Sequence, residues 1–182
     1  MNVRLTKKRE NIMKTVIITG ASNGMGYKAA KVFASKGWKV FAGARRVEKI
    51  PTDQNIVGLK LDVTDSASNH AFIAEILKQT QQIDVLINNA GYGEFSPAEE
   101  IPMENVRKQF ETNFFGAVEL TQLVLPTMRA QKSGRIINIS SIGGDLYMPL
   151  GSYYHATKAA LQQWSDALDV EIKDFGLSLI HI

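Results

Sequence analysis

The chain has 182 residues, of which 45% are hydrophobic, as is typical of one globular domain with a single core. It contains no cysteine, which excludes disulfide bonds, thiolate catalysis and cysteine-ligated zinc and fits a reducing compartment. The net charge of +3 arises in the first 14 residues, which carry +4, so residues 15–182 sum to −1. We therefore expect residues 1–13 to be a flexible basic extension of a near-neutral domain at 14–182, and no nucleic-acid partner.

The hydropathy of the chain argues against a membrane partner. No apolar run approaches the roughly 20 residues that a membrane-spanning helix needs. Charged residues from Arg4 to Glu10 occupy the place where a signal peptide would have its apolar core. These features predict a cytoplasmic protein.

Apolar runs alternate with helical stretches along the chain. In order, the sequence predicts a strand at Thr15–Thr19, a helix at Gly24–Lys36, strands at Val40–Ala44 and Ile56–Leu61, a helix at Ser66–Thr80, a strand at Val85–Asn88, a long helix at Met103–Ala130, a strand at Arg135–Ser140, a helix at Ser152–Phe175 and a strand at Leu177–Ile182. Pro126 should kink the long helix or end it early. Continuous apolar strands and βαβα alternation predict a doubly wound parallel sheet in an α/β, three-layer αβα fold, with ligands beyond the carboxyl ends of the strands.

A glycine-rich turn follows the first predicted strand and precedes the first predicted helix. Gly20 suits the tight turn, Gly24 lets the backbone approach a pyrophosphate, and Gly26 permits close packing of helix on strand. The helix N-terminus adds unpaired N–H groups and a partial positive charge. An ordinary glycine turn is the alternative, but this position favours a Rossmann-type dinucleotide site. The expected contacts in the turn are Gly20, Ser22, Asn23, Gly24, Met25 and Gly26.

The end of the second predicted strand bears on the choice between NADP(H) and NAD(H). A carboxylate there would bind the ribose 2′-hydroxyl and repel a 2′-phosphate. The chain has no acid at this point, and Arg45 can pair with the phosphate as a charge-assisted fork. This pattern favours NADP(H), although two solvated arginines, Arg45 and Arg46, are the alternative and NAD(H) stays possible.

A serine, a tyrosine and a lysine follow in an order that suits proton transfer. Tyr154 and Lys158 are four residues apart in a predicted helix and so share one face. A free phenol titrates near pH 10, and a neighbouring cation favours its ionised form. Tyr154 can then exchange a proton with a carbonyl oxygen, which Ser141, or Ser140 as the alternative, would orient.

These motifs together resemble the short-chain dehydrogenase/reductase family over Lys14–Ile182. The matching features are T-G-x-x-x-G-x-G from Thr19, N-N-A-G from Asn88, and Y-x-x-x-K from Tyr154. One departure is Asn23, where many NADP-dependent relatives carry a basic residue. The resemblance implies an NADP(H)-dependent oxidoreductase that interconverts an alcohol and a ketone or aldehyde.

The resemblance also assigns roles to individual residues. It implies that Asp62 accepts from the adenine amino group and that Val63 packs on the ring, whereas Asp62 could instead only cap the turn before Ser66. It places Asn89, Ala90 and Gly91 beside the cofactor. It favours Ser141 over Ser140, gives Lys158 the ribose hydroxyls, and has Asn113 hold a water in a proton relay to Lys158.

Family members continue with a Pro-Gly segment, a substrate lid and a seventh strand. Since this chain ends within its sixth predicted strand, we expect it to be incomplete at the C-terminus and to belong to a longer enzyme. The resemblance also implies a dimer or tetramer built on the two long helices. Apolar residues near the site hint at a hydrophobic substrate: Tyr92, Phe95, Met148, Leu150 and Tyr153.

Two other functions remain open. A non-catalytic dinucleotide sensor on the same fold would typically lose the tyrosine or the lysine, and both are present here. An epimerase or dehydratase of the extended type is disfavoured by the glycine spacing. His70, His155 and His181 lack metal-ligand spacing, so we predict no metal site and expect His155 to be incidental, pointing away from the face of Tyr154.

Overall fold

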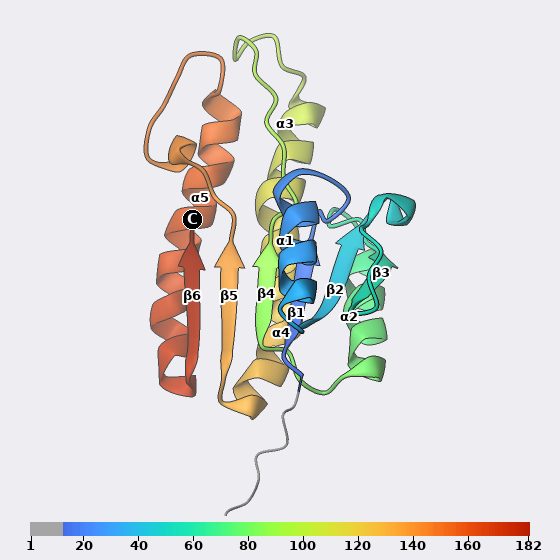
Figure 1. The fold of residues 1–182 in the computed structure, drawn as a ribbon. Coiled ribbons are helices and arrows are strands. Elements are labelled where there is room, and N and C mark those ends of the chain that lie inside the picture. Colours follow the sequence, from blue (N-terminus) through green and yellow to red (C-terminus); the bar gives the residue numbers. More distant parts are fainter. Residues whose placement is uncertain (1–12) are drawn as a thin grey trace, which may run out of the picture.

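The computed structural model describes residues 13–182, which form one six-stranded parallel sheet in the order β3-β2-β1-β4-β5-β6 (Figure 1). The predicted basic extension lies outside the described residues except for Met13. The strands are β1 (Thr15–Thr19), β2 (Lys39–Ala44), β3 (Ile56–Lys60), β4 (Val85–Asn88), β5 (Gly134–Asn138) and β6 (Leu177–His181). The order reverses beside β1, so β1 and β4 diverge into the two halves of the sheet, as in a Rossmann fold.

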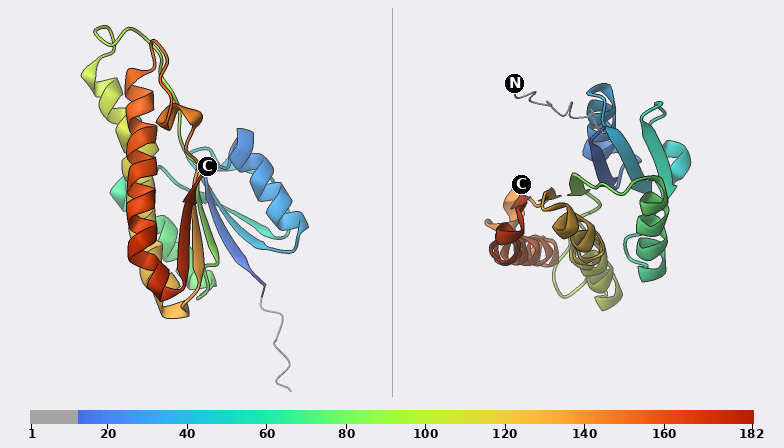
Figure 2. Two further views of the ribbon diagram at one scale, coloured as in Figure 1. Left: turned by 90° about the vertical axis from the view of Figure 1, so that its left-hand side faces the viewer. Right: turned by 90° about the horizontal axis from the view of Figure 1, so that it is seen from below.

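Helices cover both faces of the sheet. They are α1 (Gly24–Ser35), α2 (Ser66–Gln79), α3 (Met103–Phe110), α4 (Gly116–Gln131) and α5 (Ser152–Ile172), with short 3₁₀ turns η1 (Val47–Lys49), η3 (Ile142–Gly144) and η4 (Lys173–Phe175). Figure 2 shows α1 on one side of the sheet and α4 and α5 on the other. This arrangement confirms the predicted α/β, three-layer class.

Each face of the sheet has its own apolar core. On the side of α2, α4 and α5, Ile17, Phe41 and Leu86 are buried against Leu120 and other helix residues. On the side of α1, the core consists mainly of small and β-branched residues: Val16, Ile18, Ala30, Ala34, Val40, Ala42 and Ile87. Because adjacent strand residues face opposite sides, continuous apolar strands such as β1 are required to fill both cores.

A buried polar network fastens β4, β5, α4 and α5 together. The side-chain amide of Asn88 donates to Asn138 Oδ1 at 2.9 Å and to Thr121 Oγ1 at 3.1 Å. The amide of Asn138 in turn donates to Ser165 Oγ at 2.9 Å. Since buried polar groups without partners are costly, this network favours one register for the neighbouring strands that lead into the site.

The predicted helix at Met103–Ala130 is the main correction to the expected elements. The structure divides it into α3, a π-helical turn η2 (Glu111–Phe115), and α4. Pro126 does not end it, because α4 continues to Gln131, with Leu120, Val124 and Met128 buried along one side. Tertiary packing of this face offsets the loss of the backbone hydrogen bond that Pro126 cannot donate. The helical geometry is interrupted instead at Asn113, within the π turn.

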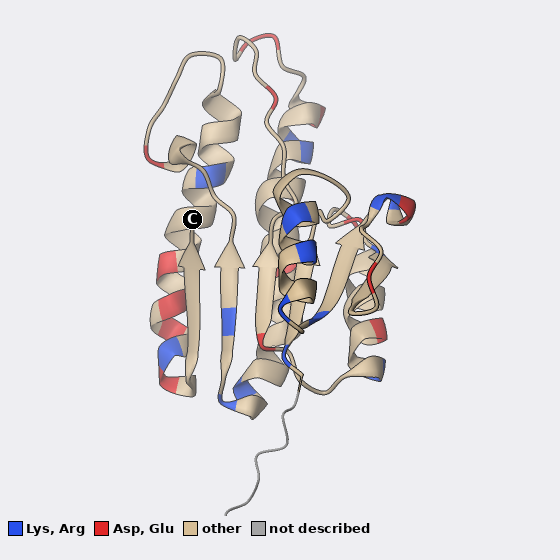
Figure 3. Ribbon diagram, in the orientation of Figure 1, with Lys and Arg blue, Asp and Glu red and all other residues tan. Residues whose placement is uncertain are grey.

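Charges of both signs are spread over the helices and loops, and the central strands carry few of them (Figure 3). Among residues 13–182, no helix is both long enough and apolar enough to cross a bilayer.

Candidate active site

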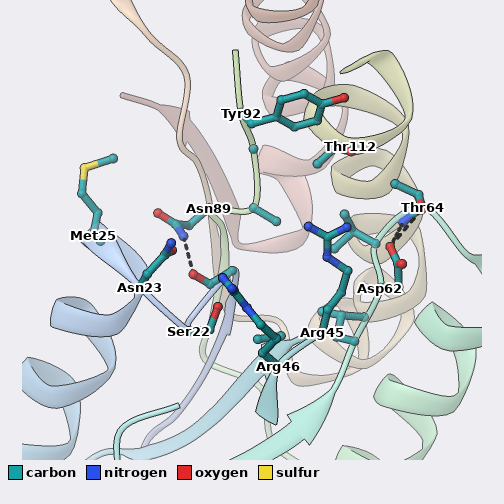
Figure 4. Close-up of a pocket in the computed structure, with 17 residues that line it drawn as sticks. Ser22, Asn23, Met25, Arg45, Arg46, Asp62, Thr64, Asn89, Tyr92 and Thr112 are labelled. Carbon is teal, nitrogen blue, oxygen red and sulfur yellow. Dashed lines mark hydrogen bonds between the residues drawn. The ribbon is translucent and has the colours of Figure 1, made fainter. Parts of the chain in front are cut away.

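A cavity of about 410 Å³ lies at the carboxyl ends of β1, β2, β3 and β4 (Figure 4). Most of the predicted cofactor residues line it, and the sequence reasoning had not assigned Arg46, Thr64, Tyr92 or Thr112 to it. The lining comprises Gly20, Ser22, Asn23, Gly24, Met25, Ala44, Arg45, Arg46, Leu61, Asp62, Val63, Thr64, Asn89, Ala90, Gly91, Tyr92 and Thr112. The strand ends thus form the crevice that doubly wound sheets use for ligands.

The glycine turn has the conformation that its spacing predicts. Gly20 and Gly24 have φ values of +67° and +55°, which residues other than glycine rarely adopt. A Cβ on Gly26 would lie 2.5 Å from Asn89 Nδ2 and 2.6 Å from Gly20 O, so only glycine allows α1 to pack this closely. A Cβ on Gly24 would meet nothing within 4 Å, which leaves the mouth of the turn open.

Asn89 fastens this turn to β4. Its side-chain amide donates to Thr19 O at 2.9 Å and to Gly20 O at 3.3 Å. The Thr19 hydroxyl in turn accepts from the backbone N–H groups of Asn89 and Ala90, both at 3.0 Å. The contacts of Asn89 are therefore to the protein backbone, and the buried Thr19 is a positioning residue that sequence reasoning missed.

Two side chains from neighbouring strand ends face the cavity opposite the glycine turn. Arg45, exposed at the end of β2, extends toward the side where Tyr92 and Thr112 lie (Figure 4). Asp62, at the end of β3, accepts from Thr64 N at 3.1 Å and from Thr64 Oγ1 at 2.8 Å. Asp62 thus lines the cavity and also stabilises the turn, while Asp65 is the residue that caps α2.

The lysine of the proposed catalytic set is buried beside this cavity. Lys158 is 5% exposed, and its ammonium donates to Ile139 O, just beyond β5, at 2.8 Å. Burial lowers its pKa to about 8. A Cβ on Gly91 would lie 3.5 Å from Lys158 Nζ, so the glycine leaves the ammonium open toward the cavity. Within residues 13–182, one of the three N–H groups of this ammonium donates a hydrogen bond, the one to Ile139 O.

Ser141 and Ser140 point to different places. Ser140 is buried and its hydroxyl donates to Lys158 O at 3.5 Å, on the inner side of α5. Ser141 is half-buried and its Oγ accepts from Gly143 N at 3.0 Å. This acceptor role leaves the Ser141 hydroxyl proton free to be donated, which favours Ser141 as the group that orients a substrate oxygen.

Tyr154 lies on the same face of α5 as Lys158. Its ring centroid is 5.9 Å from Lys158 Nζ and 5.4 Å from the ring of Phe95. A Cβ on Gly93 would approach Tyr154 Cδ2 to 3.1 Å, so the loop after β4 also contacts the ring closely. None of the three candidate catalytic side chains, Ser141, Tyr154 and Lys158, is among the lining residues of the cavity. Lys158 borders the cavity at Gly91, and the Tyr154 ring lies beside Lys158 and Gly93.

Asn113 joins the loop after β4 to α5. Its Oδ1 accepts from Tyr92 N at 3.0 Å, and its Nδ2 donates to Tyr92 O at 2.8 Å and to Thr157 Oγ1 at 3.1 Å. These bonds hold the buried amide next to the residue that precedes Lys158. A Cβ on Gly91 would lie 3.2 Å from Asn113 Oδ1 and 3.5 Å from Lys158 Nζ, so both groups border the same space.

Similarity to known proteins agrees with this geometry. The sequence profile described as short chain dehydrogenase matches residues 14–182. The chain belongs to the short-chain dehydrogenase family. It is 37% identical to a probable short-chain type dehydrogenase/reductase, VdlC, of Helicobacter pylori over 168 residues, covering 91% of this chain and 62% of that protein. It is 38% identical to a 3-ketodihydrosphingosine reductase of Bacteroides thetaiotaomicron, covering 90% of this chain and 60% of that protein.

Solved structures of short-chain dehydrogenases superimpose closely on this chain. One from Streptomyces avermitilis has a TM-score of 0.91 at 36% identity and covers 94% of this chain and 65% of its own. A metagenomic short-chain oxidoreductase in complex with NADP has a TM-score of 0.87 at 28% identity, with coverages of 92% and 80%. The chain spans about 60% of the length of the first curated relatives it matches.

His155 makes structural contacts that its spacing did not predict. It is buried, its Nδ1 lies 2.9 Å from Gly143 O, and its Nε2 accepts from Met148 N at 3.2 Å. These contacts link α5 to the segment before it, a pairing that residue spacing does not reveal because the 142–151 segment has no regular periodicity.

Proposed function

We propose that this chain carries the cofactor site and catalytic residues of an NADP(H)-dependent oxidoreductase that interconverts an alcohol and a ketone or aldehyde. The observation that carries the proposal is that buried Lys158 lies next to Gly91 in the wall of the glycine-turn cavity, with the Tyr154 ring 5.9 Å from its ammonium. Relatives support the cofactor class, since one solved neighbour is in complex with NADP and a Brucella melitensis 3-ketoacyl-(acyl-carrier-protein) reductase, 26% identical, is complexed with NADH.

The residues around the cavity fit a dinucleotide. The open mouth at Gly24 and the N-terminus of α1 suit a pyrophosphate, because backbone N–H groups and the helix dipole favour an anion there. Arg45 and Arg46 suit a 2′-phosphate. Asp62 and Val63 would face the adenine, and Asn89, Ala90 and Gly91 would flank the ribose on the nicotinamide side.

A nicotinamide cofactor held by these residues would supply the hydride for reduction of a carbonyl, or would accept it for oxidation of an alcohol. Tyr154 donates its phenolic proton to the carbonyl oxygen during reduction and accepts it back during oxidation. The Ser141 hydroxyl donates to the same oxygen, since Gly143 N occupies its acceptor side. Lys158 stabilises the phenolate by its charge and holds the ribose hydroxyls with its remaining N–H groups.

The buried position of Lys158 gives this mechanism a pH dependence. Because burial lowers the lysine pKa to about 8, the cation beside Tyr154 is present at neutral pH and is lost as the pH rises through 8 in the cofactor-free protein. Asn113, through its shared space with Lys158 at Gly91, would hold the water that returns a proton to the lysine.

The substrate we propose is apolar. Phe95 packs on the Tyr154 ring, and it is exposed together with other apolar residues of the loops after β4 and β5, namely Tyr92, Leu146, Met148 and Leu150. Tyr153, also expected near the substrate, donates its hydroxyl to Ala98 O at 3.0 Å and so packs against the loop after β4. One relative is named as a 3-ketodihydrosphingosine reductase, which supports a ketone as the substrate.

A cofactor titration tests the proposal. NADPH should bind the unaltered chain more tightly than NADH, and Arg45→Gln should weaken NADPH binding about tenfold while leaving NADH binding unchanged, because only NADPH loses a phosphate partner. Arg135→Gln, a substitution on β5 away from the cavity, is the matched control. Equal affinities of the unaltered chain for both cofactors would overturn the assignment to NADP(H).

A carbonyl panel separates the oxidoreductase from the alternatives. Absorbance loss of NADPH with apolar ketones or aldehydes is expected in the enzyme that carries this chain. Binding of NADPH without turnover would instead indicate a dinucleotide sensor, and conversion of sugar nucleotides without net oxidation would indicate an epimerase. Preference for small charged carbonyls would overturn the substrate class alone.

A further inference from the structure

His155 of α5 is buried against the segment 142–151, which precedes α5 in the chain. Its Nδ1 is 2.9 Å from Gly143 O, and its Nε2 accepts from Met148 N at 3.2 Å. An imidazole that accepts at Nε2 carries its proton on Nδ1, so Nδ1–H donates to the Gly143 carbonyl. One side chain thus holds the segment at two points, each by a defined nitrogen.

The His155 ring lies so close to Gly143 and Gly151 that neither position has room for a side chain. A Cβ on Gly143 would lie 2.5 Å from His155 Nδ1, and a Cβ on Gly151 would overlap Nε2. Real side chains do not approach so closely, so the segment closes over the imidazole only with glycine at both positions. The histidine and its two glycines form one packed unit.

This unit is linked to Ser141 through a single residue, Gly143. The Gly143 carbonyl accepts from His155, and the Gly143 N–H donates to Ser141 Oγ at 3.0 Å. The bond from His155 restrains the Gly143 carbonyl, and this limits the movement of the adjoining N–H that occupies the acceptor side of the Ser141 hydroxyl. With this acceptor position occupied, the serine hydroxyl can donate its proton to a substrate oxygen.

The second bond, from Met148, acts on the apolar part of the segment. Met148 and Leu150 are more than half exposed, and Leu150 has an unusual φ of +70° while its carbonyl accepts from Ser96 N at 2.9 Å. A leucine in the left-handed region is strained and needs surrounding contacts to persist. The bond from Met148 to His155 is one contact that holds this conformation.

We propose that His155 is a positioning residue for the reaction, which through Nδ1 orients Ser141 and through Nε2 holds the apolar Met148 and Leu150 where substrate binds. The proposal rests on the proposed function of Tyr154 and Ser141. It predicts separate kinetic consequences for the two nitrogens, because the Ser141 hydroxyl acts on the reacting oxygen and the apolar residues act on substrate binding.

Three substitutions in the enzyme that carries this chain separate the effect of the Nδ1 bond from the effect of the Nε2 bond. His155→Phe keeps a ring and removes both bonds, and should lower kcat/KM at least about tenfold, since small displacements of positioned groups cost this much. His155→Asn places an amide N–H near the Nδ1 position and should restore kcat but leave KM raised. His155→Gln places an amide oxygen near the Nε2 position and should restore KM but leave kcat lowered.

His70→Phe is the matched control, because it makes the same chemical change on the exposed surface of α2 and should leave both constants unchanged. The Kd for NADPH, which should stay within about twofold in every variant, reports that the fold is intact. If unaltered enzyme turns over and all three His155 variants match it, the positioning role is wrong and the proposed function stands; absence of turnover in unaltered enzyme contradicts the proposed function instead.

A measurement on the 182-residue chain needs no turnover. Hydrogen exchange of the Met148 amide should be slow in the unaltered chain, remain slow in His155→Gln and become at least about tenfold faster in His155→Phe and His155→Asn. The imidazole nitrogens should show the Nδ1–H form by ¹⁵N NMR. An Nε2–H form, or a Met148 amide that exchanges equally fast in all variants, would overturn the proposal.

Discussion

The dinucleotide cavity and the catalytic group beside it are built by different physical means. The glycine turn of the cavity is largely local: residues 20–26 are contiguous, and backbone conformation at Gly20 and Gly24 opens the mouth. The catalytic group draws instead on residues far apart in the chain, with Lys158 bonded to Ile139 O and Asn113 bonded to Tyr92 and Thr157. Cofactor binding and chemistry should therefore be separable by mutation.

The largest expected effect is on chemistry alone. Tyr154→Phe keeps the ring that packs on Phe95 and removes the acidic proton, so kcat should fall by about 10²–10⁴. The Kd for NADPH should change by no more than about threefold, because the hydroxyl contributes little to the cofactor cavity. Tyr153→Phe, which removes a hydroxyl from the neighbouring residue, is the control. Turnover at the unaltered rate would refute the role of Tyr154 as acid and base.

A second expectation concerns Lys158 and the stability of the cofactor-free chain. Its folded pKa of about 8 is below the unfolded value near 10.4, so both states are protonated below pH 8 and the burial cost opposes folding in full. Between about pH 8 and 10 the folded state loses its proton first, and the free energy of unfolding rises with pH.

Urea denaturation of the unaltered chain and of Lys158→Met checks this sign. Relative to the methionine variant, which has no proton to lose, the unaltered chain should gain about 2 kcal/mol between pH 7 and pH 9.5. A difference between the two chains that stays constant over this range would mean that burial does not shift the lysine pKa.

A third expectation tests the close packing of the cavity floor. Gly26→Ala should lower the free energy of unfolding by about 1–3 kcal/mol, because its Cβ would overlap Asn89 Nδ2 and Gly20 O. Gly58→Ala in β3 is the control, since a Cβ there meets Ile50 Cδ1 at an ordinary 3.4 Å. Equal thermal midpoints for the two variants would show that the turn can relax around a methyl group.

The smallest expected effect separates backbone strain from ligand contact. Gly24 and Gly37 have φ values of +55° and +77°, and a Cβ on either meets nothing within 4 Å. Alanine at either position should therefore cost about 1 kcal/mol of stability. Only Gly24→Ala should also weaken NADPH binding, by about tenfold or more, because its methyl group would occupy the pyrophosphate approach. Equal NADPH affinities in the two variants would show that the pyrophosphate does not bind at Gly24.

The sequence by itself determined the order of strands and helices and the family. The apolar runs of β1, β2 and β4 predicted a sheet buried on both faces, and the spacing of Gly20, Gly24 and Gly26 predicted the turn. These predictions succeeded because the burial of a strand and the conformation of a glycine turn depend mainly on residues that are adjacent in the sequence.

Tertiary structure alone decided where the long helix is interrupted and what His155 does. The π turn falls at Asn113, whose side-chain amide forms hydrogen bonds with Tyr92 and Thr157, which are 21 and 44 residues away in the chain. Pro126, in contrast, stays within α4. His155 bonds to Gly143 and Met148, and Thr19 bonds to Asn89 and Ala90. Such contacts join segments that only the folded sheet brings together, so no local pattern of residues could predict them.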